Sequence, residues 1–336
     1  MKPAFFKSAA DFRDWLARHH AGARELLMHY FGEVSFQRVG VLCGEYVLLD
    51  QLILLRRDGM LIKINVSWEE AWVSKTLDAH CASDFLLRRR DECLAKWDQL
   101  PSARNLPVMS GSYLANYFHW TLDFIPKRRL YNNAPGNKII IPQSILKRRF
   151  QIDLLAKTMG NKEVIVFSEP IRVSDPIIGH ELMSEEGIHW LRRTTQLRAK
   201  AGKRRIYLRR STTGTRSGRG GGISESAEFM DFLKRHAFET IDFGDAEMTV
   251  EEQVRLLDEV GIILAPHGAA LTNLVYLTPP TLVIELIGSR TPRVVYMHIA
   301  SILRLGYYGI YSDRYDAEEN VVVGSDELED AMKEYR

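Results

Sequence analysis

Short apolar runs alternate with helix-like patterns along the second half of the chain. Helices are expected where apolar residues recur three or four positions apart, at 224–236, 249–259 and 292–303, with one more starting near Gly268. Thr249 and Glu252 form a capping box that fixes one of these helix starts. Strands are expected at 205–208, 239–242, 262–265 and 282–286. This alternation predicts βαβ units, a parallel sheet and a Rossmann-like domain.

The first half of the chain has a more varied pattern. Asp58-Gly59 lies between strand-like runs and predicts a hairpin. A basic helix at 188–201 is expected to mark the passage between domains. Strands are expected at 45–49, 52–56, 61–66, 138–141 and 164–167. Helices are expected at 8–31, at 76–99 and from 142 to about 159.

The chain length adds a domain count to this picture. At 336 residues, two domains are expected. We predict an N-terminal α/β domain with a β-hairpin at 1–185 and a C-terminal Rossmann-like domain at 186–320. The last segment, 321–336, is predicted to be a helix that packs back on the N-terminal domain.

Charge and cysteine content exclude several classes of protein. Lys and Arg total 45 against 43 acidic residues, a net charge of +2, which argues against a dedicated nucleic-acid binder. Cys43, Cys81 and Cys93 are odd in number and lack CxxC spacing, so neither a disulfide framework nor a zinc site is expected. No apolar run approaches the length of a membrane span, and the first residues lack a secretory signal. A cytoplasmic location is expected, with peripheral association at the inner face of the cytoplasmic membrane left open.

Three features of the second half follow predicted strands. Arg209 and Arg210 open a loop rich in glycine and arginine, which suits a phosphate. His267 and Gly268 precede a helix whose first amides favour an anion. Glu285 lies in an apolar strand and is a candidate acceptor for ribose hydroxyls. Because ligands bind at the carboxyl ends of parallel strands, the three together predict a nucleotide-sugar site.

In the first half, the polar residues of interest fall within 116–126. If this segment is helical, His119 and Asp123 are four residues apart and share one face. A carboxylate beside an imidazole orients it and raises its basicity, which suits removal of a proton from an attacking hydroxyl. Either residue is a candidate base. The alternative is a structural role, in which the two residues form a buried pair that holds the helix against the core.

The same segments resemble glycosyltransferase family 61. The resemblance rests on residues 119–126, 206–210 and 264–273, the Glu252-Gln253 helix, and the Val283-Ile-Glu285 strand. The run from His267 to Asn273 is the most specific part. This family includes bacterial capsular-polysaccharide enzymes, plant xylan arabinosyl- and xylosyltransferases, and animal O-linked N-acetylglucosaminyltransferases.

The resemblance implies an α/β fold of GT-B architecture, two Rossmann-like domains facing across a cleft, and inverting transfer of a hexose or pentose from a nucleotide sugar. Asp123 and His119 are then the catalytic candidates, and Asn116 and Trp120 lie on the acceptor side. The donor-binding positions are Arg209, Arg210, Arg216, His267, Gly268, Ala269, Asn273 and Glu285. A glycan or lipid-linked glycan acceptor of surface polysaccharide synthesis is expected. Neither a cofactor nor a metal is expected, since no Asp-x-Asp triplet follows a strand.

Two departures from the family pattern bear on the donor. Ala265-Pro266 precedes His267 where Gly-Ala is usual, and Ala270 replaces a glycine. A non-catalytic nucleotide-sugar-binding subunit of a polysaccharide assembly complex is the alternative function. A phosphotransferase is disfavoured because the chain has no GxxxxGK[ST] loop.

Overall fold

A computed structural model describes residues 4–5, 38–49, 53–64, 74–77, 84–109, 111, 114–143, 146–180, 183–210, 222–243, 248–288 and 295–333. The chain forms two compact units. Residues 1–34 and 196–336 make up one, called here the C-terminal unit, and Ser35–Thr195 make up the N-terminal unit. The division therefore falls at the end of a helix at Thr195, later than predicted, and the first residues belong with the C-terminal part of the chain.

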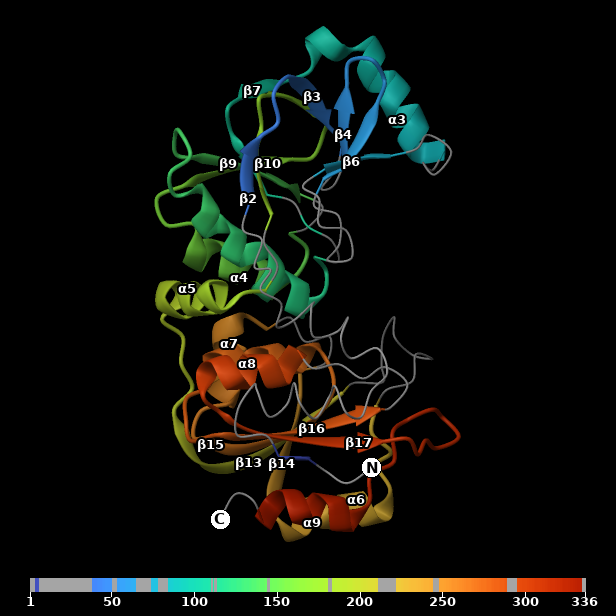
Figure 1. Ribbon diagram of the computed structural model, residues 1–336, viewed down its shortest axis with the longest axis vertical. Coiled ribbons are helices and arrows are strands. Elements are labelled where there is room, and N and C mark those ends of the chain that lie inside the picture. The colour runs from blue at the N-terminus through green and yellow to red at the C-terminus, as the bar shows by residue number, and fades with distance from the viewer. Residues whose placement is uncertain are drawn as a thin grey trace. The chain divides into compact units, whose positions relative to one another are not determined.

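One six-stranded sheet forms the centre of the C-terminal unit (Figure 1). Its spatial order is β1-β17-β16-β15-β13-β14. All neighbouring strands from β14 to β17 are parallel, whereas β1 pairs antiparallel with β17 at the edge. The strands are β1 (Ala4–Phe5), β13 (Ala201–Arg209), β14 (Phe238–Asp242), β15 (Val260–Pro266), β16 (Leu282–Gly288) and β17 (Gly306–Ser312). Every residue of β15 is buried, as the apolar run predicts for a central parallel strand.

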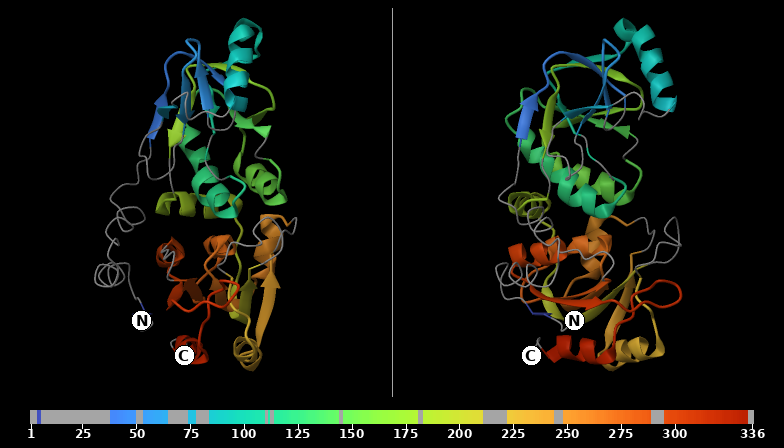
Figure 2. Two further views of the ribbon diagram at one scale, coloured as in Figure 1. Left: turned by 90° about the vertical axis from the view of Figure 1, so that its right-hand side faces the viewer. Right: turned by 45° about the vertical axis from the view of Figure 1, so that its right-hand side comes forward.

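Helices connect these strands on both faces of the sheet. In Figures 1 and 2, α7 and α8 cover one face, and α6 and α9 lie together on the other. The helices are α6 (Ala227–Arg235), α7 (Val250–Leu256), the 3₁₀ helix η6 (Ala269–Tyr276), α8 (Val295–Leu303) and α9 (Ser325–Lys333). Numbered in chain order from β13, the parallel strands run 2-1-3-4-5, a doubly wound arrangement whose switch point lies between β13 and β15. The Rossmann-like prediction for this half is confirmed.

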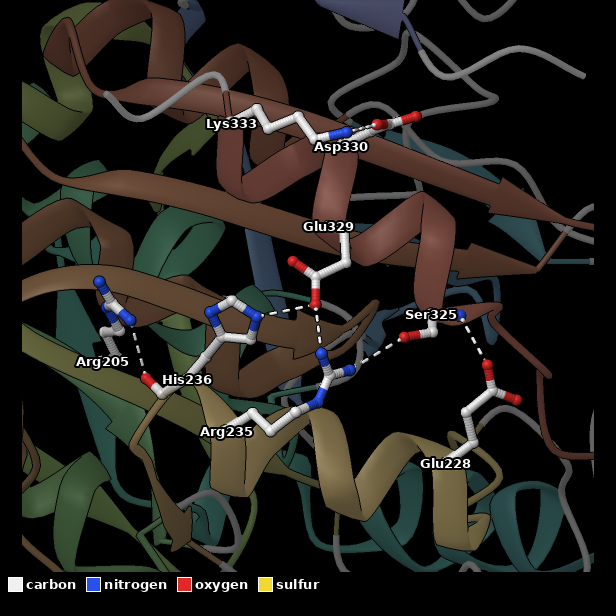
Figure 3. Close-up of polar contacts among 8 residues, drawn as sticks. All are labelled: Arg205, Glu228, Arg235, His236, Ser325, Glu329, Asp330 and Lys333. Carbon is white, nitrogen blue, oxygen red and sulfur yellow. Dashed lines mark hydrogen bonds and ion pairs between the residues drawn. The ribbon is translucent and has the colours of Figure 1, made fainter.

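The last helix packs within the C-terminal unit. Leu328, Ala331 and Met332 of α9 join the core that β16, β17 and α6 form. In Figure 3 the side chains of Arg235 and His236 both point toward Glu329, at 3.0 and 2.9 Å from its Oε1. The expectation that 321–336 packs back on the N-terminal domain is therefore wrong, because the apolar face of α9 is buried against the sheet of the C-terminal unit.

The N-terminal unit contains two sheets. A five-stranded sheet has the order β10-β9-β8-β12-β2, in which only the β12–β2 pair is antiparallel. Its strands are β2 (Arg38–Val41), β8 (Pro107–Val108), β9 (Lys138–Pro142), β10 (Glu163–Phe167) and β12 (Ile177–His180). The sequence predicts β9 and β10, whereas β12 falls in a stretch assigned to no element.

The second sheet of this unit is mainly antiparallel, in the order β6-β5-β4-β3-β11-β7. It contains the predicted Asp58-Gly59 hairpin, in which the Arg56 amide donates to the Met60 carbonyl across the turn at 2.8 Å. Its strands are β3 (Glu45–Leu48), β4 (Ile53–Arg56), β5 (Leu61–Ile64), β6 (Ser74–Leu77), β7 (Ser102–Arg104) and β11 (Ile171–Ser174). This half is therefore α/β, but it contains more than the one parallel sheet of a simple Rossmann-like domain.

Helices of the N-terminal unit differ in type. They are α3 (Asp84–Ala95), the 3₁₀ helix η2 (Trp97–Gln99), the π-helix η3 (His119–Phe124), the 3₁₀ helix η4 (Ile125–Tyr131), α4 (Arg149–Thr158) and α5 (Glu185–Thr195). Lys127 and Arg128 of η4 are buried, although a run of basic residues usually covers a solvated face. The Arg128 guanidinium is bonded to Asn132 Oδ1 and the Met159 carbonyl, and burial lowers the pKa of Arg128.

Two sequence predictions fall outside the described residues. These are the helices expected within 8–31 and the glycine-rich part of the loop after Arg210, including Arg216. Among the helices that are described, none is both long enough and apolar enough to cross a membrane.

Candidate functional site

Arg210 and His267 come together at the switch point of the C-terminal sheet. Arg210 follows β13, and His267 follows β15, the strand next to β13. Arg210 Nη1 donates to the His267 carbonyl oxygen at 3.3 Å. A cation thus lies where two parallel strands end and diverging connections leave room for a ligand.

The 3₁₀ helix η6 begins beside Arg210, with Gly268 as the residue before it and Ala269 as its first residue. A Cβ placed on Gly268 would lie 4.0 Å from Arg210 Cδ. The first amides of a helix have no carbonyl partner within the helix and carry partial positive charge. Arg210 and these amides therefore offer positive groups at one strand end, as an anionic ligand requires.

The buried carboxylate of Glu285 orients the imidazole of His267. His267 Nδ1 lies 2.5 Å from Glu285 Oε1, and the Tyr307 hydroxyl donates to Glu285 Oε2 at 2.6 Å. Because a carboxylate accepts hydrogen bonds only, Nδ1 carries a proton and Nε2 is the nitrogen that remains for a ligand. The His267 side chain is 28% exposed and that of Glu285 0% exposed.

The position of Glu285 corrects the role expected from the sequence. Its side chain is inside the unit, and each oxygen already accepts a hydrogen bond from a neighbouring residue. A fully buried carboxylate with both oxygens bonded is not placed to hold ribose hydroxyls. The contact of Glu285 nearest the surface is the half-buried His267.

Arg209 is also placed differently from the prediction. Its guanidinium forms a bidentate ion pair with Glu225, with Nε 2.7 Å from Oε1, and the Tyr207 hydroxyl lies 3.4 Å from the same carboxylate. Bonding to Arg209 lowers the pKa of Glu225. Neighbouring arginines in the sequence thus differ: Arg209 pairs with an acid, and Arg210 reaches the backbone at His267.

Asn273 is a buried structural link. It is 1% exposed, and its Nδ2 donates to Gln253 Oε1 at 3.0 Å and to the Ala270 carbonyl at 3.2 Å. It therefore fastens η6 to α7, so its expected donor contact is corrected. Gln253 lies in the predicted Glu252-Gln253 helix, but the sequence does not indicate that it pairs with Asn273.

The predicted His119–Asp123 pair is present in the N-terminal unit. His119 Nδ1 lies 2.6 Å from Asp123 Oδ2, and the Met183 amide donates to Asp123 Oδ1 at 3.0 Å. Both carboxylate oxygens thus face donors, and with the proton of His119 on Nδ1 the basic atom of the ring is Nε2. The side chains of His119 and Asp123 are 27% and 18% exposed, so the pair reaches the surface.

A π-helical turn presents this pair. The Ile125 amide bonds to the Trp120 carbonyl five residues earlier, the spacing of a π-helix, which is a frequent feature of functional sites. Asn116 Oδ1 accepts from the Phe118 amide and shapes the turn that precedes it. Asn116 thus has a local structural contact in addition to its predicted acceptor-side role.

Trp120 lies in the core of this unit. Its side chain is 0% exposed and stacks on Phe124 with ring centroids 4.5 Å apart. An acceptor sugar has no access to a fully buried ring, so the predicted acceptor contact of Trp120 is corrected. Trp120 and Phe124 are buried, whereas the adjacent His119 and Asp123 are partly exposed.

A hollow elsewhere in the N-terminal unit contains none of these residues. It has a volume of about 400 Å³ and is lined by residues of the β4–β5 turn and of η2, among them Arg57, Asp58 and Trp97. Its walls carry charges of both signs, which gives no preference for a nucleotide diphosphate.

Comparison with known proteins gives a family match that includes both His119 and His267. The Glycosyltransferase 61 family matches residues 117–284, half of the chain, from the residue before Phe118 to the strand of Glu285. This chain belongs to glycosyltransferase family 61. The match spans the His119–Asp123 turn and the switch point with Arg210 and His267.

Two plant enzymes are similar over shorter stretches. A beta-1,2-xylosyltransferase of Oryza sativa subsp. japonica is 38% identical over 65 residues, which are 19% of this chain and 12% of that protein. A beta-1,2-xylosyltransferase of Arabidopsis thaliana is 32% identical over 88 residues, which are 26% of this chain and 16% of that protein. The alignments thus cover less than a fifth of either curated relative.

Proposed function

We propose that this family 61 protein is an inverting, metal-independent glycosyltransferase that moves a sugar from a nucleotide-sugar donor to a hydroxyl group of a glycan acceptor. The observation that carries the proposal is the meeting of Arg210 and His267 at the β13–β15 switch point, with Arg210 Nη1 3.3 Å from the His267 carbonyl. Nucleotides bind at such a point in doubly wound sheets. Membership of the family supports the same reaction class.

In this proposal, the C-terminal unit binds the donor diphosphate. The Arg210 guanidinium and the amides of Gly268 and Ala269 face the phosphates, and His267 Nε2 accepts a hydrogen bond from a ribose hydroxyl of the nucleotide. Negative charge grows on the diphosphate as its bond to the anomeric carbon breaks, and fixed positive groups stabilise that charge. These groups supply the charge that a metal ion provides in other transferases, which is why we propose a metal-independent reaction.

His119 is the proposed base, with Asp123 as its positioning residue. His119 Nε2 takes the proton of the acceptor hydroxyl, whose oxygen attacks the anomeric carbon on the face opposite the departing phosphate. One C–O bond forms, the bond from carbon to phosphate oxygen breaks, and the configuration inverts. Asp123 accepts from His119 Nδ1 and stabilises the imidazolium that results.

The proposal also covers the donor sugar and the pathway in which the reaction takes place. The similar plant enzymes are named as beta-1,2-xylosyltransferases, so a nucleotide-activated pentose, xylose first, is the proposed donor. We place the reaction in surface polysaccharide synthesis, with a GT-B division of labour between a donor unit and an acceptor unit. A lipid-linked acceptor would bring the protein to the membrane surface from the cytoplasm.

Two measurements test the proposal in sequence. Thermal stabilisation by UDP, GDP, CDP, ADP and TDP identifies the nucleotide, and Arg210→Ala is expected to abolish the stabilisation. Release of that nucleotide from its sugar conjugates, with and without acceptor glycans, then tests turnover. Stabilisation without turnover for any conjugate would favour a non-catalytic nucleotide-sugar-binding subunit. No stabilisation by any diphosphate would contradict both functions.

A further inference from the structure

The carboxylate that orients His267 is held from a second strand. Glu285 lies on β16 and Tyr307 on the adjacent strand β17. The Tyr307 hydroxyl donates to Glu285 Oε2 at 2.6 Å, while Glu285 Oε1 faces His267 Nδ1 at 2.5 Å. A line of hydrogen bonds therefore runs from the interior of the sheet to the half-buried imidazole.

A glycine makes room for this arrangement. Glu285 is in register with Gly309, and Tyr307 and Tyr311 flank that glycine on the same face of β17. A Cβ at Gly309 would lie 3.3 Å from each tyrosine ring and 3.4 Å from the Tyr307 hydroxyl. The missing side chain thus lets the hydroxyl of Tyr307 reach across to Glu285.

Tyr307 is a permanent donor in this position. Burial, together with the negative charge of Glu285, holds the pKa of Tyr307 well above its ordinary value. The hydroxyl therefore keeps its proton. Glu285 itself has no access to water, so its two protein donors replace hydration of the carboxylate.

We propose that Tyr307 is a positioning residue for His267. Its hydroxyl satisfies one oxygen of Glu285, so that the other oxygen keeps the proton of His267 on Nδ1 and leaves Nε2 as an acceptor for a ribose hydroxyl of the donor. The identity of the ligand rests on the proposed function, whereas the hydrogen-bond chain does not. Tyr307 lies beyond the residues that match the family, 117–284.

The proposal predicts that the Tyr307→Phe substitution changes the tautomer of His267. A buried carboxylate that loses one of two donors favours its protonated form. Protonated Glu285 donates to His267 Nδ1, so the imidazole changes to the tautomer with its proton on Nε2. A role in packing alone would leave the tautomer unchanged, because phenylalanine keeps the ring.

Histidine-selective ¹⁵N NMR of the full chain without ligand reads this directly. The wild-type protein is expected to show His267 protonated on Nδ1, and Tyr307→Phe to show the proton on Nε2. Tyr308→Phe is the matched control, since Tyr308 is buried in the core on the opposite face of the same strand. Wild-type ring signals of His267 in Tyr307→Phe would overturn the proposal.

Two further measurements separate the possible failures. Affinity for the stabilising nucleoside diphosphate is expected to fall by up to about tenfold in Tyr307→Phe, the effect of losing one hydrogen bond to Nε2, and to stay unchanged in Tyr308→Phe. If no diphosphate binds the wild type, the proposed function fails while the NMR result still decides the role of Tyr307. Should Tyr307→Phe not fold, Gly309→Ala is the second variant: its Cβ would lie 3.3 Å from the Tyr307 ring and 3.4 Å from the hydroxyl, so it is expected to shift the hydroxyl by a few tenths of an ångström and to move the His267 signals in the same direction.

Discussion

His119 Nδ1 lies 2.6 Å from Asp123 Oδ2, and in the other unit His267 Nδ1 lies 2.5 Å from Glu285 Oε1. In both pairs the second carboxylate oxygen accepts from the protein, from the Met183 amide or from the Tyr307 hydroxyl. In each pair the proton on Nδ1 makes Nε2 the basic nitrogen of the ring. The surroundings suggest different tasks: His119 lies on a partly exposed π-helical turn, whereas His267 adjoins Arg210 at a strand end.

Replacing His119 is expected to stop catalysis without loss of donor binding. His119→Ala should lower kcat by about 10² to 10⁴, the usual contribution of a general base, and Asp123→Asn by less, because the imidazole remains. Diphosphate-induced thermal stabilisation should match the wild type in both. His189→Ala is the control, since His189 is an exposed histidine on α5 of the same unit. Full activity in both His119→Ala and Asp123→Asn would remove this pair from the mechanism.

Replacing Arg210 is expected to affect ligand binding, whereas replacing its neighbour Arg209 is expected to affect stability. Arg210→Ala should weaken diphosphate binding at least tenfold, because one charged hydrogen bond is worth about 1.5–3 kcal/mol. Arg209→Ala should mainly lower the melting temperature, because it leaves Glu225 without its bidentate partner. Isothermal titration and thermal unfolding of both variants check this. Equal losses of affinity in the two would show that the sequence prediction, in which both arginines bind the donor, was correct.

The ion pair between α6 and α9 should make stability depend on pH in the acid range. Hydrogen bonding to His236 holds the pKa of Glu329 below its ordinary value of 4.5. A depressed carboxyl pKa contributes stability above the unfolded value, and this contribution is lost as pH falls through the folded value. Glu329→Gln should therefore lower stability at pH 7 by up to about 1 kcal/mol and make little difference near pH 3.

Urea unfolding at the two pH values checks the Glu329 prediction. Asp330→Asn is the control, since Asp330 lies next to Glu329 on α9 but pairs only with Lys333 at the surface among the contacts described. An equal loss at both pH values for Glu329→Gln would show that packing, and not charge, is responsible.

Gly179 is expected to tolerate no side chain. A Cβ there would lie 2.8 Å from the hydroxyl of the buried Tyr131, which accepts from the Gly179 amide and donates to the Val108 carbonyl. Gly179→Ala should cost about 1–3 kcal/mol through overpacking. Tyr131→Phe removes the nearest of the obstructing atoms along with two hydrogen bonds. Adding Gly179→Ala to Tyr131→Phe should therefore cost less than Gly179→Ala alone, and simple additivity in urea unfolding would contradict this.

The sequence predicted the C-terminal sheet well where strands are continuous apolar runs. β15 and β16 are such runs, because parallel central strands are buried on both faces. β17 was missed because its glycines and tyrosines lack that pattern, and β12 because four residues after a proline give too short a signal. Tyr307 was missed for the same reason as its strand.

For the site, spacing predicted proximity but not orientation. The order of strands brings Arg210 and His267 to one end of the sheet, and the interval of four residues brings His119 to Asp123. Whether a side chain faces solvent or the interior depends on its neighbours across the sheet. Glu285 is buried because Gly309 admits the Tyr307 hydroxyl beside it, a relationship between residues 24 positions apart that no local pattern contains.

The short strand β1 gives the beginning of the chain an influence on the donor site. Ala4 and Phe5 pair with Gly309 and Tyr308, so β1 occupies the edge of the strand that carries Tyr307. Without it, β17 would present an open edge of backbone amides and carbonyls, which invites pairing between molecules and aggregation. A change that displaces Ala4 and Phe5 would therefore uncover this edge and disturb the setting of His267, whereas a change on α9 would leave the edge covered.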